Sequence, residues 1–255
     1  MRKVGSTTDT ADANGEYTNG NVANGISPTI INAEMMNTFQ RELVNVVEGS
    51  GLELDPDDDS QVLKAIGGGR LLNIVTFAKS GTYTPTKGTK KIKVTITGGG
   101  ASGGKSASGS TYARSGGAGG TRIAFINVPA GNTTITIGAG GESCSRAGDI
   151  GNAGGDSKFG NSITAFGGTT SFGKGGSSTG EGFGIEGGNG NSGASYSNNT
   201  FGGVSFWGGG GSGYDGQDAT TVDARAYGSG GAGVNQDVGK SGKGGDGICV
   251  IEEYS

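Results

Sequence analysis

Serine and glycine residues occur in the sequence at a spacing that is known from hydrolases. Residues 176–180 (GSSTG) match the nucleophile elbow, in which a serine attacks an acyl group after a histidine takes its proton. The sequence contains no histidine. A triad of serine, histidine and aspartate is therefore excluded.

Three other glycine motifs have the spacing of nucleotide-binding loops. Residues 182–187 and 188–193 both match the dinucleotide fingerprint, but neither follows a hydrophobic strand or opens a helix. Residues 168–174 are close to a phosphate-binding loop, but Gly175 stands where a magnesium-binding hydroxyl is required. We therefore expect no nucleotide and no other cofactor.

Alternating carboxylates at Asp55, Asp57 and Asp59 have the start of a calcium-loop pattern. Ser60 stands where that loop needs glycine, and Ile66 stands where it needs a bidentate glutamate. The pattern instead favours helix capping, and we predict no bound metal.

Aromatic side chains lie in the less regular stretches between glycine clusters, among Ser, Asn and Asp. Tyrosine and tryptophan in such surroundings are typical of antibody paratopes, where rigid rings supply contact area. Rings can stack on sugars or fill surface pockets. We expect Trp207, Tyr214 and Tyr227 to be exposed, while Phe201 and Phe206 could equally cover glycine backbone. The candidate binding residues are Tyr112, Tyr196, Asn198, Trp207, Tyr214, Asp215 and Tyr227.

The segments that must position these residues are very rich in glycine. Residues 1–97 hold 11 of the 59 glycines, so the other 48 fall in residues 98–255 and make up nearly a third of them. Only 31% of the chain is apolar, and the mean hydropathy is −0.32. A conventional hydrophobic core is therefore difficult to build in this region.

Glycine recurs at every third position in several places, as at 184, 187, 190 and 193. A polyproline-II type helix has three residues per turn, so this period leaves a bare edge where backbones can approach. Collagen is excluded because the chain has only four prolines and none after Pro129. The period predicts packed polyglycine-II helices, a lattice held by hydrogen bonds between segments.

Residues 1–69 are expected to form a small helical module for attachment and oligomerisation. Residues 1–28 read as an extended or looped arm. Apolar residues at helical spacing predict a helix over 33–48, with Asn32 as its N-cap and glycines 49 and 51 as its end. A shorter helix is predicted over 61–66. The apolar faces of both helices would pack on other copies of the chain or on the next domain.

Residues 70–255 are expected to form the second domain. Strand-like runs cover 71–77, 91–97, 122–128, 133–137 and 247–252. The last run is more than a hundred residues from the others, so we expect the two ends of the glycine region to join one sheet. The predicted fold is mainly β with a polyglycine-II lattice, in which strands within 71–137 and 247–253 enclose the glycine segments, preceded by the small α-helical module.

Charge and hydropathy exclude several classes of partner. The net charge is −4, and no basic run is longer than Lys90-Lys91, so a nucleic acid partner is not expected. No segment is long and apolar enough for membrane insertion, and the N-terminus has no signal pattern, which favours synthesis in the cytoplasm. Cys144 and Cys249 lack metal-type spacing, and Cys249 reads as a buried small hydrophobe.

Three segments resemble parts of phage tail fibres. Residues 29–66, which end in QVLKAI, look like the short module that precedes the tip in Mu-like prophage tail fibres. Residues 77–100, with FAKSGTYTP and VTITGGG, resemble the start of the glycine-rich tip domain, and residues 244–254 (GGDGICVIEEY) resemble its end. The glycine region is also similar in kind to the tip adhesins of T-even long tail fibres.

The resemblance implies a virion protein at the tail-fibre tip, made in the host bacterial cytoplasm. It implies a bacterial surface receptor, either lipopolysaccharide or an outer-membrane protein, and contacts with other tail-fibre or baseplate proteins. The resemblance to tail fibres, together with the amphipathic helix, suggests a homotrimer.

Three alternatives remain open from the residues alone. The chain could be a structural fibre segment or a fibre assembly protein that binds no receptor. It could be an ice-binding protein, although no regular flat face of Thr or Ser is visible. It could be a depolymerase with paired carboxylates, for which Asp215, Asp218 and Asp223 are available. Nothing in the sequence brings two of these carboxylates together.

Overall fold

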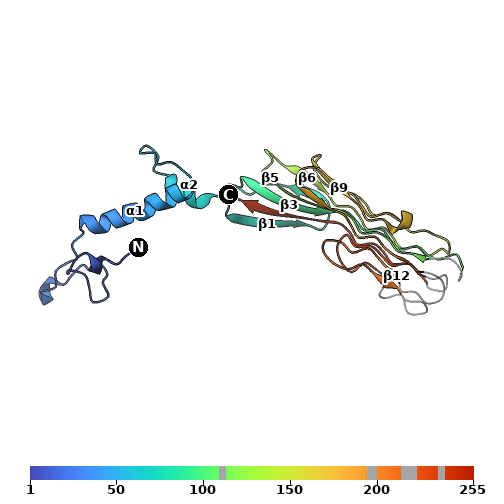
Figure 1. Cartoon of the computed structure of the whole chain (residues 1–255), viewed down its shortest axis with the longest axis horizontal. Helices are drawn as coiled ribbons and strands as arrows, with labels where there is room; N and C mark the ends of the chain where they lie inside the picture. The colour runs from blue at the N-terminus through green and yellow to red at the C-terminus, as the bar shows by residue number, and fades with distance from the viewer. Residues whose placement is uncertain (109–112, 194–199, 214–222, 235–238) are drawn as a thin grey trace. The chain divides into compact units, whose positions relative to one another are not determined.

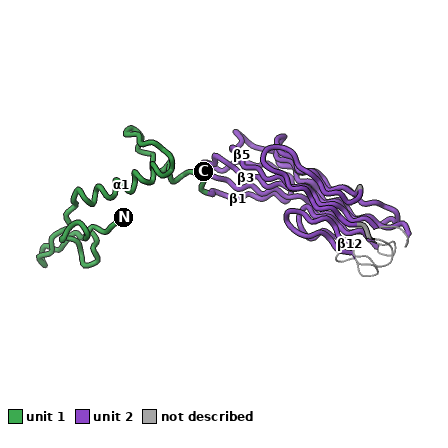
Figure 2. Tube along the Cα trace, viewed as in Figure 1, with its two compact units in different colours: residues 1–70 green, residues 71–255 purple. Residues whose placement is uncertain are grey.

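The computed structural model describes residues 1–108, 113–193, 200–213, 223–234 and 239–255. The chain forms two compact units, Met1–Arg70 and Leu71–Ser255 (Figure 2). Each unit is described by itself below.

The first unit holds two α-helices, α1 (Ala33–Gly49) and α2 (Gln61–Gly67), and two short 3-10 turns, η1 (Val4–Ser6) and η2 (Val22–Asn24). The Asn32 side chain accepts a hydrogen bond of 3.0 Å from the backbone N–H of Met35, which confirms the predicted N-cap of α1. Ser60 makes no capping bond to α2, because its hydroxyl donates to Asp58 instead.

The arm that precedes α1 folds back on itself. The Thr29 hydroxyl donates to the Thr10 carbonyl, and the Asn32 amide donates to the Thr7 carbonyl at 2.7 Å. Helix α1 buries Met35 and Val47 but exposes Met36, Leu43 and Val46. An apolar face of α1 is therefore uncovered within this unit.

The second unit begins with an antiparallel five-stranded sheet in the order β1-β14-β3-β5-β10 (Figure 1). The last strand of the chain, β14, lies between β1 and β3 and pairs with both along its length. The expectation that one sheet ties both ends of the glycine region is thus confirmed. The strands are β1 (Leu71–Phe77), β14 (Ile248–Tyr254), β3 (Lys91–Thr97), β5 (Thr121–Asn127) and β10 (Phe183–Ile185).

A second five-stranded sheet has the order β2-β6-β7-β8-β9. Its strands are short: β2 (Gly81–Tyr83), β6 (Thr133–Thr136), β7 (Ser157–Phe159), β8 (Ile163–Ala165) and β9 (Ser178–Thr179). Two small pairs lie among the glycine segments: β4 (Ala113–Arg114) with β11 (Ser192–Gly193), and β12 (Thr200–Phe201) with β13 (Ser212–Gly213). A single 3-10 turn, η3, covers Ser171–Gly173.

The main hydrophobic core lies between the two five-stranded sheets. Each sheet contributes fully buried aliphatic or aromatic side chains to a single cluster. The members include Ile92, Val94, Ile96 and Ile251 from the first sheet, and Tyr83, Ile135, Phe159 and Ile163 from the second. Alternation along β3 supplies part of this face, as the period of two in its sequence predicts.

Beyond Thr97 the chain continues as extended glycine segments that run side by side (Figure 1). The backbone N–H groups of residues 98–105 donate to three neighbouring segments in rotation. Gly98, Ala101 and Gly104 donate to residues 114–120. Gly99, Ser102 and Lys105 donate to residues 149–155, and Gly100 and Gly103 donate to residues 242–245. These bonds are 2.8 to 3.0 Å long. Consecutive N–H groups therefore rotate among three neighbours, whereas in a pleated sheet they alternate between two.

The carbonyl groups of the same central segment accept hydrogen bonds from further segments. Their donors are the backbone N–H groups of Gly141, Gly168, Gly231 and Val234. Gly98–Gly104 are all buried, and a β-carbon added at Gly100 or Gly103 would overlap the backbone at Ser229 or Ala232. The interior of this region is consequently made of hydrogen-bonded backbone and not of apolar side chains.

The described residues form a mainly β protein with two short helices. Neither helix is long and apolar enough to cross a membrane.

Candidate functional site

Two of the seven candidate binding residues, Trp207 and Tyr227, lie within the part of the chain that the structure describes. The other five lie outside the described residues: Tyr112, Tyr196, Asn198, Tyr214 and Asp215. Within the described residues, the candidate site therefore consists of Trp207, Tyr227 and the residues around them.

Trp207 is half-buried, so the expectation of an exposed side chain at this position is wrong. Its indole N–H donates a hydrogen bond of 2.8 Å to the Thr97 hydroxyl at the end of β3. Its ring packs edge-to-face against Phe206, with a centroid distance of 5.1 Å. A partly buried indole needs a partner for its one donor, and Thr97 supplies it.

Ser205 connects the Trp207 segment to the Tyr227 segment. The Ser205 hydroxyl donates to the Tyr227 carbonyl at 2.6 Å and accepts from the Trp207 backbone N–H at 3.1 Å. The structure thus brings together two candidates that are twenty residues apart in the sequence. We call the surface formed by Phe206, Trp207, Arg225 and Tyr227 the aromatic surface.

Tyr227 is 44% exposed, in agreement with the expectation from sequence. It lines a shallow cavity of about 290 Å³ together with Arg225 and Asp246. Phe206 is also exposed, at 47%. Tyr227, Arg225 and Asp246 therefore bring a ring, a cation and a carboxylate to one shallow cavity.

The carboxylates around the aromatic surface bind backbone N–H groups. Asp246 accepts from Gly140 at 2.8 Å, and Asp223 accepts from Lys243 at 2.7 Å. Asp223 was one of three carboxylates available to a depolymerase, and the other two lie outside the described residues. Among the described residues no three His, Cys, Asp or Glu side chains gather as a metal site would require.

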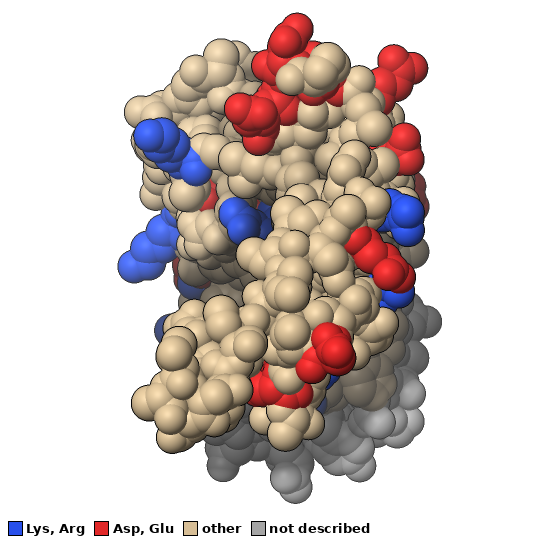
Figure 3. Space-filling model, turned by 90° about the vertical axis from the view of Figure 1, so that its left-hand side faces the viewer, with Lys and Arg blue, Asp and Glu red and all other residues tan. Residues whose placement is uncertain are grey.

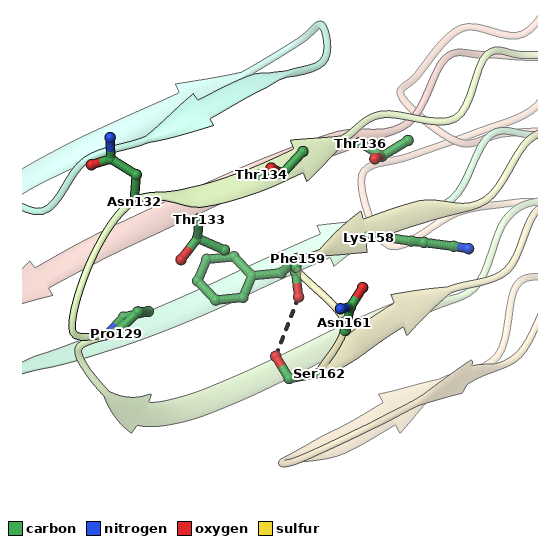
Figure 4. Close-up of a pocket in the computed structure, with 10 residues that line it drawn as sticks. Pro129, Asn132, Thr133, Thr134, Thr136, Lys158, Phe159, Asn161 and Ser162 are labelled. Carbon is green, nitrogen blue, oxygen red and sulfur yellow. Dashed lines mark hydrogen bonds between the residues drawn. The ribbon is translucent and has the colours of Figure 1, made fainter.

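A larger cavity of about 780 Å³ lies over the second sheet (Figure 4). Its lining comes from β6, β7, the turn before β6 and the turn after β7, and consists mainly of Thr, Asn and Ser side chains. Ser162 donates to the Phe159 carbonyl at 3.2 Å across one side of it. Lys158 is its one ionisable lining residue. A pair of groups for acid–base catalysis is therefore missing from this lining.

Charged side chains do not form a broad basic surface on the face drawn in Figure 3, where Lys and Arg are scattered among Asp and Glu. The described ion pairs lie at the surface, as between Lys93 and Glu252 at 2.8 Å. Such pairs contribute little to stability and mark no anion site.

Comparison with known families gives one result for this second unit. The model of a family described as a glycine-rich domain matches residues 76–254. The chain belongs to this family. The match begins inside β1 and ends with β14, so it covers both sheets and the glycine segments between them. A search of curated proteins found no match.

The most exposed ring among the described residues of this glycine-rich domain, Phe172, is not among the candidates from the sequence. Phe172 lies in η3 and is 79% exposed. Its backbone has φ 56°, the one positive φ among the described residues other than glycine. Its place beside Gly173 is the only sequence signal, because a left-handed turn there is usually made by glycine.

Proposed function

We propose that the protein is a non-enzymatic adhesin at the tail-fibre tip of a phage or a phage-like particle. It binds a receptor on a Gram-negative cell, either lipopolysaccharide or an outer-membrane protein. Recognition is passive: a rigid body of glycine segments presents aromatic and polar side chains, and several fibres bind one cell at once.

The glycine segments form a polyglycine-II lattice in this proposal. The support is the rotation of donors along residues 98–105, where every third N–H reaches the same neighbour. A helix with three residues per turn produces this rotation, and a pleated strand with a period of two does not. The overlap that β-carbons would cause at Gly100 and Gly103 explains why glycine is needed.

The observation that carries the binding role is the aromatic surface. Phe206 and Tyr227 expose large parts of their rings although the neighbouring interior is well packed backbone. Rings held by a rigid scaffold lose little entropy on binding, so they can supply much of the binding energy.

The remaining parts of the proposal rest on the resemblance to Mu-like tail fibres. The first unit attaches to other tail-fibre or baseplate proteins and forms a homotrimer. The exposed apolar residues Met36, Leu43 and Val46 of α1 support an assembly role, because an uncovered apolar face is a common interface. The protein is then part of the virion.

The proposal is tested by binding of the fluorescently labelled full chain to a panel of Gram-negative strains. Each strain is paired with a mutant that has truncated lipopolysaccharide. We expect binding to some strains and not to others, and loss of binding on the truncated partner if the receptor is a glycan. Binding to none of the strains would favour the alternative, a structural fibre segment or an assembly protein.

A further inference from the structure

We propose that Phe172 and the cavity beside it form a saccharide subsite for a sugar ring of a bacterial surface glycan. The inference deepens the proposed function and rests on it, since it names the receptor class as glycan. The subsite is distinct from the aromatic surface around Trp207 and Tyr227.

The backbone at Phe172 is the first observation. Its φ of 56° and ψ of 22° lie in the left-handed region, which a bulky residue rarely adopts. Glycine adopts this region freely, as the next residue Gly173 does with φ 62°. Strained residues of this kind cluster at ligand-binding sites.

The exposure of the ring is the second observation. Burial does not offset the strain, because Phe172 is 79% exposed. The turn that carries it is closed by the Thr169 N–H, which donates to the Lys174 carbonyl at 2.9 Å. The short coil of η3 beside the glycine segments in Figure 1 therefore holds an aromatic ring out toward solvent.

One face of the ring is covered by a cation. The Arg114 guanidinium lies 4.8 Å from the centroid of the Phe172 ring, a distance typical of cation–π contacts. Phe172 lines a neighbouring cavity of about 590 Å³, and Arg114 does not. We infer that Arg114 orients the ring from one side and leaves the other face to the cavity.

Polar groups complete the cavity. Its other lining residues are Thr169, Lys174, Gly175, Glu186 and Asn189. The ammonium group of Lys174 and the carboxylate of Glu186 form no hydrogen bond or ion pair with any described residue, although they line the same cavity. Asn189 is held in place, because its amide oxygen accepts from the Gly175 N–H at 2.9 Å. Its amide nitrogen is left to donate to a ligand.

These groups fit a sugar ring better than a peptide. A pyranose has an apolar face of C–H groups for the Phe172 ring and hydroxyls that both donate and accept hydrogen bonds. Lys174 supplies a donor, Glu186 an acceptor and Asn189 a donor. A helical peptide would need a continuous apolar groove, and the cavity has one ring among polar residues. The cavity volume lies within the usual range for small ligands.

The test measures binding of free oligosaccharides to the full chain by saturation-transfer NMR. The probes are core and O-antigen oligosaccharides released by mild acid from the lipopolysaccharides of the strain panel. The key variant is Phe172→Gly, because glycine accepts the backbone conformation and removes only the ring. We expect at least one oligosaccharide to bind, and Phe172→Gly to weaken it about tenfold. The melting temperature should be unchanged or higher.

Phe183→Ala is the matched control, since Phe183 is 59% exposed in β10 but does not line the cavity. It should leave the affinity unchanged, while Glu186→Gln should lower it. The inference is overturned if no oligosaccharide binds, or if Phe172→Gly binds as well as the natural chain. Binding of the labelled chain to whole cells gives a separate result. If strain-selective binding survives Phe172→Gly, the adhesin function is supported and the saccharide subsite is excluded.

Discussion

Glu253 is the one fully buried charged side chain among the described residues. It accepts hydrogen bonds from the Tyr83 hydroxyl at 2.7 Å, the Thr86 N–H at 2.9 Å and the Thr86 hydroxyl at 2.5 Å. Burial alone would raise the pKa of its carboxyl, but these hydrogen bonds outweigh burial and hold the pKa below its ordinary value of 4.5. Burial and the nearby Glu253 carboxylate raise the pKa of Tyr83.

This cluster makes stability depend on pH. Because the folded pKa of Glu253 is depressed, its contribution is present above about pH 4.5 and is lost as the pH falls through the folded value. We expect Glu253→Gln to cost about 2 kcal/mol of unfolding free energy at pH 7, with a smaller difference at pH 3. Urea unfolding at both pH values measures this. The exposed Glu181→Gln is the control, and an equal cost at both pH values would contradict the account.

The roles of some individual residues could be predicted from the sequence, and those of others could not. The Asn32 cap could be predicted because Asn before an apolar period is a local signal. The partner of Trp207 could not, because Thr97 is 110 residues away. Phe172 was missed since its backbone conformation is set by the turn between Thr169 and Lys174, for which the neighbouring Gly173 is only a weak sequence signal.

At the scale of elements, the helices and the strands of four or more residues that were predicted were found, whereas the strands of two or three residues were not predicted. Helix α1 and the strands β1, β3, β5 and β14 lie within two residues of their predicted bounds. Each strand of this group has seven residues, enough for alternation to show. Strands such as β8 and β9 have only two or three residues, and tertiary pairing defines them rather than local sequence.

The packing of the glycine segments predicts a strong difference between two glycine substitutions. A β-carbon at Gly103 would overlap the backbone at Ala232, whereas one at Gly131 meets nothing within 4 Å. We expect Gly103→Ala to cost about 3 kcal/mol or more, since backbone cannot move aside as a side chain can.

Gly131→Ala should stay within about 0.5 kcal/mol of the natural chain. Thermal and denaturant unfolding of the two variants measure the difference. Equal stability of both variants would show that the segments around Gly103 are not packed as described.

At the scale of the whole molecule, the uncovered face of α1 predicts assembly. We expect light scattering at micromolar concentration to give three times the 25.0 kDa mass of the single chain. Leu43→Glu should shift the mass toward the monomer, because Leu43 is 52% exposed in the single chain and a charge would oppose its burial. Asn45→Glu is the control, because Asn45 is exposed on the opposite face of the same helix. If the natural chain has the mass of a monomer, the proposed trimer is excluded.

The central claim is that side chains over a rigid glycine body bind a cell-surface receptor. Binding isotherms on a strain that binds the labelled full chain test it most directly, with Tyr227→Ala as the variant. Tyr227 is exposed and only its backbone carbonyl takes part in the described hydrogen bonds, so the fold should keep its melting temperature. The account predicts an affinity at least about tenfold lower for Tyr227→Ala. Unchanged affinity, or natural protein that binds every strain equally, would contradict it.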